Sequence, residues 1–472
     1  MERWSGACIA CLVLAAAASA QDTARQAQRL EQELNEILEQ RYEQVADLSA
    51  LEASRIDYGA YVQVSGTGAD RLNGTTRIFG QVDARLWVDA RHLGHRVYAR
   101  ARFRYMWFDK GDSWWAGGDG LRYPIGDRWW YAFDWRTHKQ TTEGVDPGWS
   151  WKVRVGRQLV SWATGTTLRR TLYAARLRGE WDKAHVEAMV GQTPGADFID
   201  FDATRPGYTS DTDRLFYGLI ADWRGFRDHQ PYVYFLGQSD NNDQSLPGGA
   251  RYGYDSYYFA LGSSGQFGGT VLYRFEFIYE FGKSISDING AFPQSNDDIN
   301  AYAVKFEMFW TPRRFPKLRD FRLDFEWLMG SGDADRGHSA HTVGGNAAGT
   351  NDKSFNAWGY YNTGLVLAPD LANLLSFRLS PRWRPRRNAE QGSRFGIGAD
   401  FFVFLKTDED APLSVPTLPG ERYVGFEIDL TIEWQITSDV AIDARYGIFL
   451  PGDAFERTSP LHFVYLGISY GF

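Results

Sequence analysis

Residues 76–91 read TRIFGQVDARLWVDAR, a run in which two kinds of side chain alternate. From Ile78 onward the even positions are apolar or small, as at Val82. The odd positions are polar, charged or aromatic, as at Arg77 and Asp83. Because successive side chains of a β-strand point to opposite faces, this period of two predicts a strand with one apolar and one polar face.

The same alternation extends through the rest of the chain. Clear runs lie at 76–91, 96–107, 128–138, 149–160, 213–224, 269–282, 298–311, 319–330, 394–406, 422–435 and 439–450, weaker runs at 58–66, 168–179, 184–193, 230–239, 254–264, 357–367 and 374–386, and a terminal run at 461–472. The runs number about 18 or 19, and single-chain bacterial barrels favour even numbers. We therefore expect an all-β fold, a single transmembrane antiparallel β-barrel of about 18 strands, with an error of about two.

Strand length and composition favour a membrane barrel over a soluble β-sandwich. Runs of about 12 to 16 residues exceed the usual globular strand of about five or six and suit a tilted bilayer crossing. The chain contains 18 Trp and 25 Tyr, the residues that form aromatic girdles on membrane barrels. Tight connections such as 91–95 alternate with long polar ones such as 332–354. The last run ends in Phe472, as a strand recognised by barrel-assembly machinery would.

The N-terminus predicts export across the inner membrane. Residues 1–20 combine Arg3, an apolar stretch and a closing Ala18-Ser19-Ala20, which is a signal-peptide pattern. Both cysteines, Cys8 and Cys11, lie within this segment. The mature chain then has no thiol, and no segment is long and apolar enough for a spanning helix. We expect the signal peptide at 1–20, a leader at 21–56 and the barrel at 57–472, in the cell outer membrane of a Gram-negative bacterium.

The leader predicts a short amphipathic helix in the periplasm. Residues 23–54 contain no Gly or Pro, and Leu30, Leu34 and Leu38 stand on one helical face. Residues 21–56 carry eight acidic and four basic side chains. Two interpretations stay open: a coiled coil that sets the oligomeric state, or a solvated leader.

The polar face of the strands should line an aqueous lumen. An Arg on the lipid face at the bilayer midplane costs about 2 to 4 kcal/mol, so the Arg-bearing faces should point inward. We expect pore-lining cations on this argument at Arg77, Arg85, Arg96, Arg100, Arg102, Arg104, Lys152, Arg154, Arg378, Arg382, Arg384 and Arg445. Phe79, Trp87 and Tyr98 share these faces and offer stacking surfaces for sugar rings.

Acidic side chains on the same faces leave two interpretations of the lumen. The candidates are Asp83, Asp89, Glu276, Glu280, Asp324, Glu326, Asp400, Glu427, Asp429, Glu433 and Asp443. They can pair with the Arg residues across strands and neutralise them. Alternatively, Arg clusters early in the barrel and acids late, so one wall attracts an anion. Guanidinium groups bind carboxylates in bidentate fashion, which suits an acidic sugar chain.

Two segments resemble the alginate-export porin family. The first is Val153-Arg154-Val155-Gly156-Arg157-Gln158, followed by Gly165 and Leu168-Arg169, and the second is residues 446–455. The resemblance covers roughly residues 57–472 and implies a monomeric 18-stranded barrel that exports a polyanionic exopolysaccharide through an Arg-rich constriction. Arg157 and Arg169 match the family's positions and join the expected pore-lining residues. After Arg169 the chain departs from the family by lacking its Asn and Phe-Asp pair.

These observations rank the possible functions. We expect a channel that passes an anionic, alginate-like polysaccharide or oligosaccharide outward, with outer-membrane lipid and periplasmic export machinery as partners. The alternative is a general or small-solute porin, held as a trimer by the leader coil. The histidines form no Ser, His and Asp arrangement, and no metal-ligand spacing recurs, so we expect no enzyme, catalytic residue, cofactor or metal. The net charge of −8 argues against nucleic-acid binding.

Overall fold

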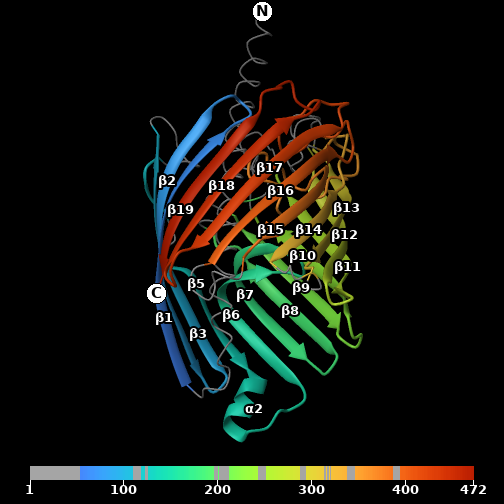
Figure 1. The fold of residues 1–472 in the computed structure, drawn as a ribbon. Coiled ribbons are helices and arrows are strands. Elements are labelled where there is room, and N and C mark those ends of the chain that lie inside the picture. Colours follow the sequence, from blue (N-terminus) through green and yellow to red (C-terminus); the bar gives the residue numbers. More distant parts are fainter. Residues whose placement is uncertain are drawn as a thin grey trace, which may run out of the picture.

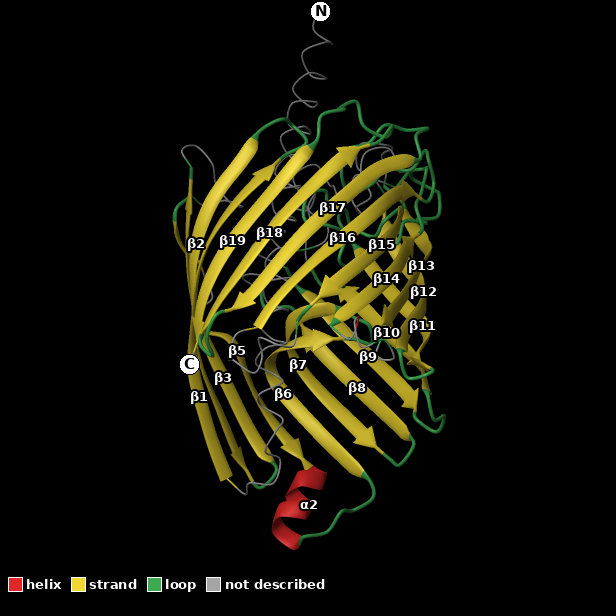
Figure 2. Ribbon diagram, viewed as in Figure 1, coloured by secondary structure: helices red, strands yellow, loops and turns green. Residues whose placement is uncertain are grey.

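The computed structural model shows a closed antiparallel β-barrel (Figures 1 and 2). It describes residues 54–109, 118–122, 126–195, 200, 212–242, 251–286, 294–312, 315, 318, 320–336, 346–385 and 394–471. The strands are β1 (Ser54–Asp70), β2 (Thr76–His92), β3 (His95–Phe108), β4 (Gly120–Arg122), β5 (Gly126–Asp134), β6 (Ser150–Ser161), β7 (Arg169–Glu180), β8 (Ala184–Gln192), β9 (Arg214–Trp223), β10 (His229–Asp240), β11 (Tyr254–Phe267), β12 (Val271–Ile285), β13 (Asn296–Trp310), β14 (Phe321–Gly330), β15 (Leu374–Trp383), β16 (Arg394–Lys406), β17 (Tyr423–Gln435), β18 (Val440–Pro451) and β19 (Leu461–Gly471). One helix of the described residues, α2 (Trp135–Glu143), interrupts this order.

The barrel has 18 strand positions, as the sequence predicts. The described residues form 19 strand segments in one sheet. β4 and β5 both pair with β3 and thus make one interrupted crossing, which reduces 19 segments to 18 positions. β1 pairs with β2 on one side and with β19 on the other, so the sheet closes. Closure leaves no long free edge in the sheet, which a membrane requires.

The two ends of the barrel differ in their connections. At one end the strands are joined by short turns, such as residues 93–94 and 436–439, and by α2 with its flanking residues (Figure 1). At the other end the connections are longer and include residues 331–373 and 407–422. We call these the short-turn end and the long-loop end. Outer-membrane barrels place short turns in the periplasm and long loops outside the cell.

The outer face of the barrel is apolar, as the alternation predicts. On β19, Val464, Leu466 and Ile468 are exposed, whereas the intervening Phe463 and Tyr465 are buried. A belt of exposed apolar side chains on this scale is unstable in water and is suited to lipid. Among the described residues, no helix is long and apolar enough to cross a bilayer.

Two predicted runs differ from the structure. Residues 357–367 form no strand; the segment lies inside the barrel, where Trp358 is fully buried. Its alternation reflects packing against interior surfaces and not a lipid-facing edge. Only the first part of the predicted run 128–138 is a strand, because β5 ends at Asp134 and α2 begins at Trp135. The Asp134 side chain accepts a hydrogen bond from the Thr137 amide at 3.1 Å, an N-cap that starts the helix.

The expected leader lies mostly outside the described part of the chain. β1 begins at Ser54, so the last three residues of the predicted 21–56 leader belong to the barrel. Residues 21–53 are not among the described residues, and neither is the expected signal peptide. The predicted helix and the coiled-coil interpretation therefore stay predictions.

Candidate solute pathway

Arg residues of β2 and β3 give one side of the lumen a positive charge. The inward face of these two strands carries seven Arg, namely Arg77, Arg85, Arg91, Arg96, Arg100, Arg102 and Arg104, against two acids, Asp83 and Asp89. Six of the seven are residues that the sequence pattern singles out. We call this set the basic wall.

Among the described residues, three carboxylates form ion pairs with five of the seven guanidinium groups. The pairs are Arg85–Asp83 (2.9 Å), Arg102–Asp83 (2.5 Å), Arg91–Asp89 (2.9 Å), Arg96–Asp89 (2.7 Å) and Arg100–Asp127 (2.6 Å). The third acid, Asp127, comes from β5. On the inward faces of β2 and β3, seven Arg residues thus accompany two acids, Asp83 and Asp89. Ion pairs within β2 and between neighbouring strands hold these cations in place.

The other two predicted Arg residues lie toward the long-loop half of these strands. Arg77 is buried and is the second residue of β2. Arg104 lies in register with Asp83 of β2 and with Arg122 of β4. Arg77 and Arg104 thus continue the basic wall toward the long-loop end.

Nearer the short-turn end, an aromatic ring contacts Arg96 of the basic wall and one further cation, Arg154. The guanidinium carbon of Arg154 lies 4.3 Å from the centroid of Trp130, and that of Arg96 lies 5.1 Å from it. Tyr98 stacks on the same ring at 5.4 Å. Lys152 is 3.8 Å from Asp134. Contact with a ring holds a guanidinium group while leaving its edge available for hydrogen bonding.

Arg157 differs from its predicted place in the lumen. Its strand partners are Trp129 and Tyr173, whose side chains lie on the exposed outer face. The Arg157 Nε donates to the carbonyl oxygen of Asp127 at 3.0 Å, and its guanidinium carbon lies 5.7 Å from the Tyr173 ring. The Arg157 side chain therefore packs within the barrel wall, against Asp127 and Tyr173, and does not join the basic wall.

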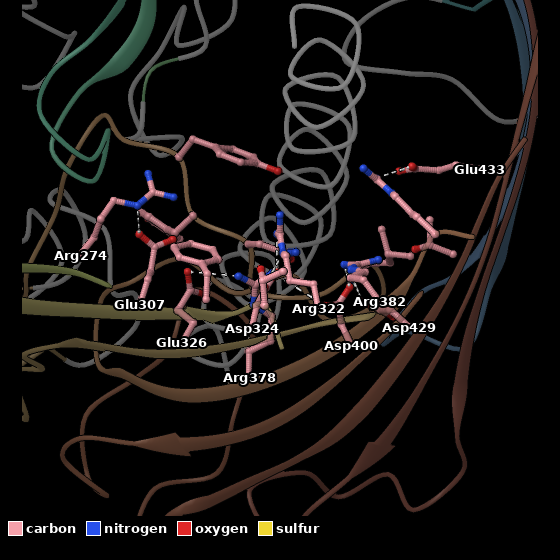
Figure 3. Close-up of a pocket in the computed structure, with 18 of the residues that line it drawn as sticks. Arg274, Glu307, Arg322, Asp324, Glu326, Arg378, Arg382, Asp400, Asp429 and Glu433 are labelled. Carbon is pink, nitrogen blue, oxygen red and sulfur yellow. Dashed lines mark hydrogen bonds and ion pairs between the residues drawn. The ribbon is translucent and has the colours of Figure 1, made fainter. Parts of the chain in front are cut away.

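A cavity of about 580 Å³ lies against another part of the barrel wall, on strands β12 to β18 (Figure 3). Its charged lining is nearly balanced, with eight cations and seven acids. The cations are Arg169, Arg274, Lys305, Arg322, Arg378, Arg382, Arg384 and Arg445, and the acids are Glu307, Asp320, Asp324, Glu326, Asp400, Asp429 and Glu433. This side of the lumen thus presents both signs of charge.

Ion pairs lie around the cavity, some within one strand and others between strands. The pairs are Arg274–Glu307 (3.1 Å), Lys305–Glu326 (3.8 Å), Arg322–Asp324 (2.5 Å), Arg378–Glu326 (3.4 Å), Arg382–Asp400 (2.6 Å), Arg384–Glu433 (2.6 Å) and Arg445–Asp443 (3.1 Å). Figure 3 shows several of them directed along the cavity surface. Such an array offers donors and acceptors for hydroxyl groups as well as for a carboxylate.

The structure brings the four predicted cations Arg378, Arg382, Arg384 and Arg445 to this cavity, together with Arg169. Sequence reasoning missed three others, namely Arg274, Lys305 and Arg322. The sequence did contain a signal for two of them. Glu276 and Asp324 were expected to face inward, and Arg274 and Arg322 each lie two residues before one of them, so the alternation of a strand places them on the same face.

Two connections from the long-loop end enter the barrel. We call residues 346–373, between β14 and β15, the strap, and residues 162–168, between β6 and β7, the inner turn. Their backbones bond to each other: the Trp358 amide donates to the Thr167 carbonyl at 2.9 Å, and the Tyr360 amide to the Gly165 carbonyl at 2.9 Å. Together they cross the lumen beside the cavity.

Glycine permits the close contact between the two connections. A Cβ atom on Gly359 would lie 1.8 Å from the Thr166 carbonyl oxygen. The neighbouring Trp358 is fully buried, and its ring lies 4.8 Å from the guanidinium carbon of Arg214 on β9. The strap is therefore packed as tightly as a protein core at this point.

An ion pair holds the N-terminal part of the strap in place. Arg336 and Asp352 form a fully buried ion pair. Nearby, the Asp333 carboxylate accepts hydrogen bonds from the amides of Lys353 (2.9 Å) and Asp335 (3.0 Å). Burial raises the pKa of the Asp333 carboxyl above its ordinary value. Within the described residues there is no group of three or more His, Cys, Asp or Glu side chains arranged to hold a metal.

Both the sequence and the fold match known proteins. A family model described as alginate export matches residues 142–468. The fold is similar to the crystal structure of Pseudomonas aeruginosa OccK11 (OpdR), with 11% identity, 89% of this chain and 96% of that chain covered, and a TM-score of 0.50. It is also similar to Acinetobacter baumannii OccAB4, with 12% identity, 89% and 99% covered, and a TM-score of 0.50. No curated protein matches the sequence.

Proposed function

Because the chain belongs to the alginate export family and forms an outer-membrane channel, we propose that it passes an anionic, uronate-bearing saccharide along the basic wall. The family suggests outward passage, and periplasmic export machinery would then deliver the solute. The apolar belt of the barrel contacts outer-membrane lipid.

The positive charge of the basic wall is the observation that carries this proposal. The inward faces of the two neighbouring strands β2 and β3 carry seven Arg residues and two acids, although the whole protein has a net charge of −8. Anion preference must therefore come from local placement. A guanidinium group already paired with Asp83 or Asp89 binds a uronate weakly, so a chain of uronates meets many weak sites and can still move on.

The cavity supports a saccharide as the solute. Its ion pairs present acceptors and donors at close spacing, and Tyr360 and Phe309 contribute aromatic surface. Charged side chains that are already ion-paired can bind sugar hydroxyl groups without a large additional cost in desolvation free energy. The basic wall would then favour solutes that carry carboxylates, and the cavity would favour solutes that carry hydroxyl groups.

Planar-bilayer recording of the mature protein tests the proposal. We expect short oligouronates to block the open channel, with the block weakened about tenfold in Arg102→Ala, as the loss of a charge-assisted contact implies. Lys139→Gln is the matched control, since it removes one positive charge from α2 outside the barrel. Absence of block, or equal block in Arg102→Ala and the parent protein, would refute the uronate proposal.

A second candidate is a channel for single sugar acids or short oligomers. The observation that favours it is the strap, which crosses the lumen and leaves a cavity of about 580 Å³ beside it. A series of oligouronates of increasing length separates the candidates in a liposome-swelling assay. A sharp length limit supports the short-solute channel, and passage of long chains supports the polymer channel.

A further inference from the structure

Four carboxylates on the barrel wall bind the strap and the inner turn through backbone amides. Glu276 and Glu280 lie on β12, and Glu427 and Asp429 lie on β17. All four side chains are buried. Glu276 holds the inner turn by accepting hydrogen bonds from the Thr164 amide (3.3 Å) and hydroxyl (2.9 Å).

On β12 the strap is held near its middle. Glu280 accepts a hydrogen bond from the Asn356 amide at 2.9 Å and from the Tyr254 hydroxyl at 2.5 Å. The Tyr258 hydroxyl donates to the Asn356 carbonyl at 2.6 Å, so both backbone polar groups of Asn356 are bound by the wall. Interior backbone groups require such partners, because little water reaches them.

On β17 three successive amides of the strap meet two carboxylates. The Leu365 amide donates to Asp429 at 3.0 Å, the Val366 amide to Glu427 at 2.7 Å, and the Leu367 amide to Glu427 at 3.0 Å. Consecutive amides that converge in this way form an anion-binding concavity, and here the anion belongs to the barrel itself.

The residue before these amides shows that the fit is close. Gly364 has a φ of 90°, and a Cβ atom there would lie 2.3 Å from the Glu427 Oε1 atom. A side chain at this position would therefore displace the carboxylate. The strap turns at Gly364 so that its next three amides face β17.

From this geometry we propose that Glu276, Glu280, Glu427 and Asp429 are positioning residues that set the width of the solute pathway by holding the strap and the inner turn across the lumen. The strap residues Tyr360, Tyr361, Asn362 and Leu365 line the cavity, so its position decides the cavity's cross-section. The inference rests on the channel function but not on the identity of the solute.

A cysteine reporter tests whether the carboxylates hold the strap. Leu367 is 3% exposed, and the mature chain from residue 21 has no cysteine, so Leu367→Cys provides one buried thiol. We expect a water-soluble thiol reagent to label it about tenfold faster or more when Glu427→Gln or Glu280→Gln is added, because a charge-assisted contact is lost and local opening becomes easier. Unitary conductance in planar bilayers should rise in the same variants.

Glu187→Gln is the matched control. Glu187 is an ion-paired carboxylate of β8, 2.6 Å from Arg176, and it lies outside the cavity lining. This variant should leave both the labelling rate and the conductance at the parent values. Heat-dependent migration on gels verifies that each variant has a folded barrel; if Glu427→Gln does not fold, Asp429→Asn removes a single amide contact instead.

The outcomes separate this inference from the proposed function. Parent-like labelling and conductance in folded Glu427→Gln and Glu280→Gln would overturn it, even if oligouronates block the channel. Faster labelling with larger conductance would support it, even if oligouronates fail to block. A rise in labelling in Glu187→Gln as well would show general loosening of the barrel and would also overturn it.

Discussion

Asp83 shows how single residues tune the lumen. Its carboxylate is 1% exposed and pairs with both Arg85 and Arg102. One carboxylate of formal charge −1 thus contacts two cations and neutralises half of their formal charge. The sequence predicted that both Arg residues face inward, because they lie on the polar faces of their alternating runs. Ion pairing with the acids was one of two interpretations of the sequence, and the pair between Arg102 and Asp83 depends on the register between β2 and β3.

Removing the Asp83 carboxylate should increase anion preference. In Asp83→Asn the formal charge of the basic wall rises by one, and Arg85 and Arg102 keep their positions on the strands. The reversal potential in a tenfold KCl gradient should therefore shift further toward the chloride value. The control is the isosteric change Asn73→Asp, which adds one negative charge in an exposed turn outside the lumen. A shift of Asp83→Asn toward the potassium value would contradict the lumen assignment.

Gly359 should tolerate no side chain. The separation of 1.8 Å between an added Cβ atom and the Thr166 carbonyl oxygen means that Gly359→Ala must push the strap away from the inner turn. We expect a loss of about 1 to 3 kcal/mol in the free energy of unfolding, measured with denaturant, because overpacking forces backbone shifts. Gly66→Ala is the control, since no atom lies within 4 Å of a Cβ at that position. Equal stability of the two variants would show that the inner contact is not close.

At the scale of elements, the period of two predicts strands well because every strand of the barrel has one face toward lipid and the other toward the polar lumen. The predicted run 394–406 has the observed bounds of β16, and 422–435 differs from β17 by one residue. The prediction fails at 357–367, where the contrast is different. There, apolar residues such as Trp358 pack inside the barrel, and alternation no longer indicates a lipid face.

Helix α2 is the element whose start depends on one side chain. Asp134→Ala removes the hydrogen bond to the Thr137 amide, so the helix should lose about 1 kcal/mol of local stability. Faster hydrogen exchange at the Thr137 amide is the expected result. Glu143→Gln, which breaks only the exposed pair with Lys139, should change exchange much less. Unchanged exchange at the Thr137 amide in Asp134→Ala would show that the start of α2 does not depend on this hydrogen bond.

At the scale of the whole molecule, anion preference should depend on salt. The basic wall acts through a charge surplus in an aqueous lumen, and the screening length falls from about 10 Å at 0.1 M to about 3 Å at 1 M salt. The chloride-to-potassium permeability ratio should therefore decrease as KCl rises over this range, while permeation of an uncharged sugar stays constant. A ratio independent of salt would show that selectivity arises from direct contacts alone.

The sequence predicted the fold better than the pathway. Barrel class, strand number and the inward face follow from local alternation, which needs no knowledge of distant contacts. The pathway depends on which strands lie opposite each other and on where the strap runs. Glu427 was expected to face the lumen, but no local pattern indicates that its partners are the amides of Val366 and Leu367, about 60 residues earlier in the chain.

The unequal sides of the lumen have a consequence for electroneutrality. A polyanion that crosses a membrane separates charge unless counter-ions travel with it. In the proposed polymer channel, uronates would follow the basic wall, and the carboxylates of the cavity, such as Asp324 and Asp400, would offer hydrated potassium or sodium ions a parallel route. The saccharide would then cross as a neutral salt, without building up a membrane voltage that opposes its passage.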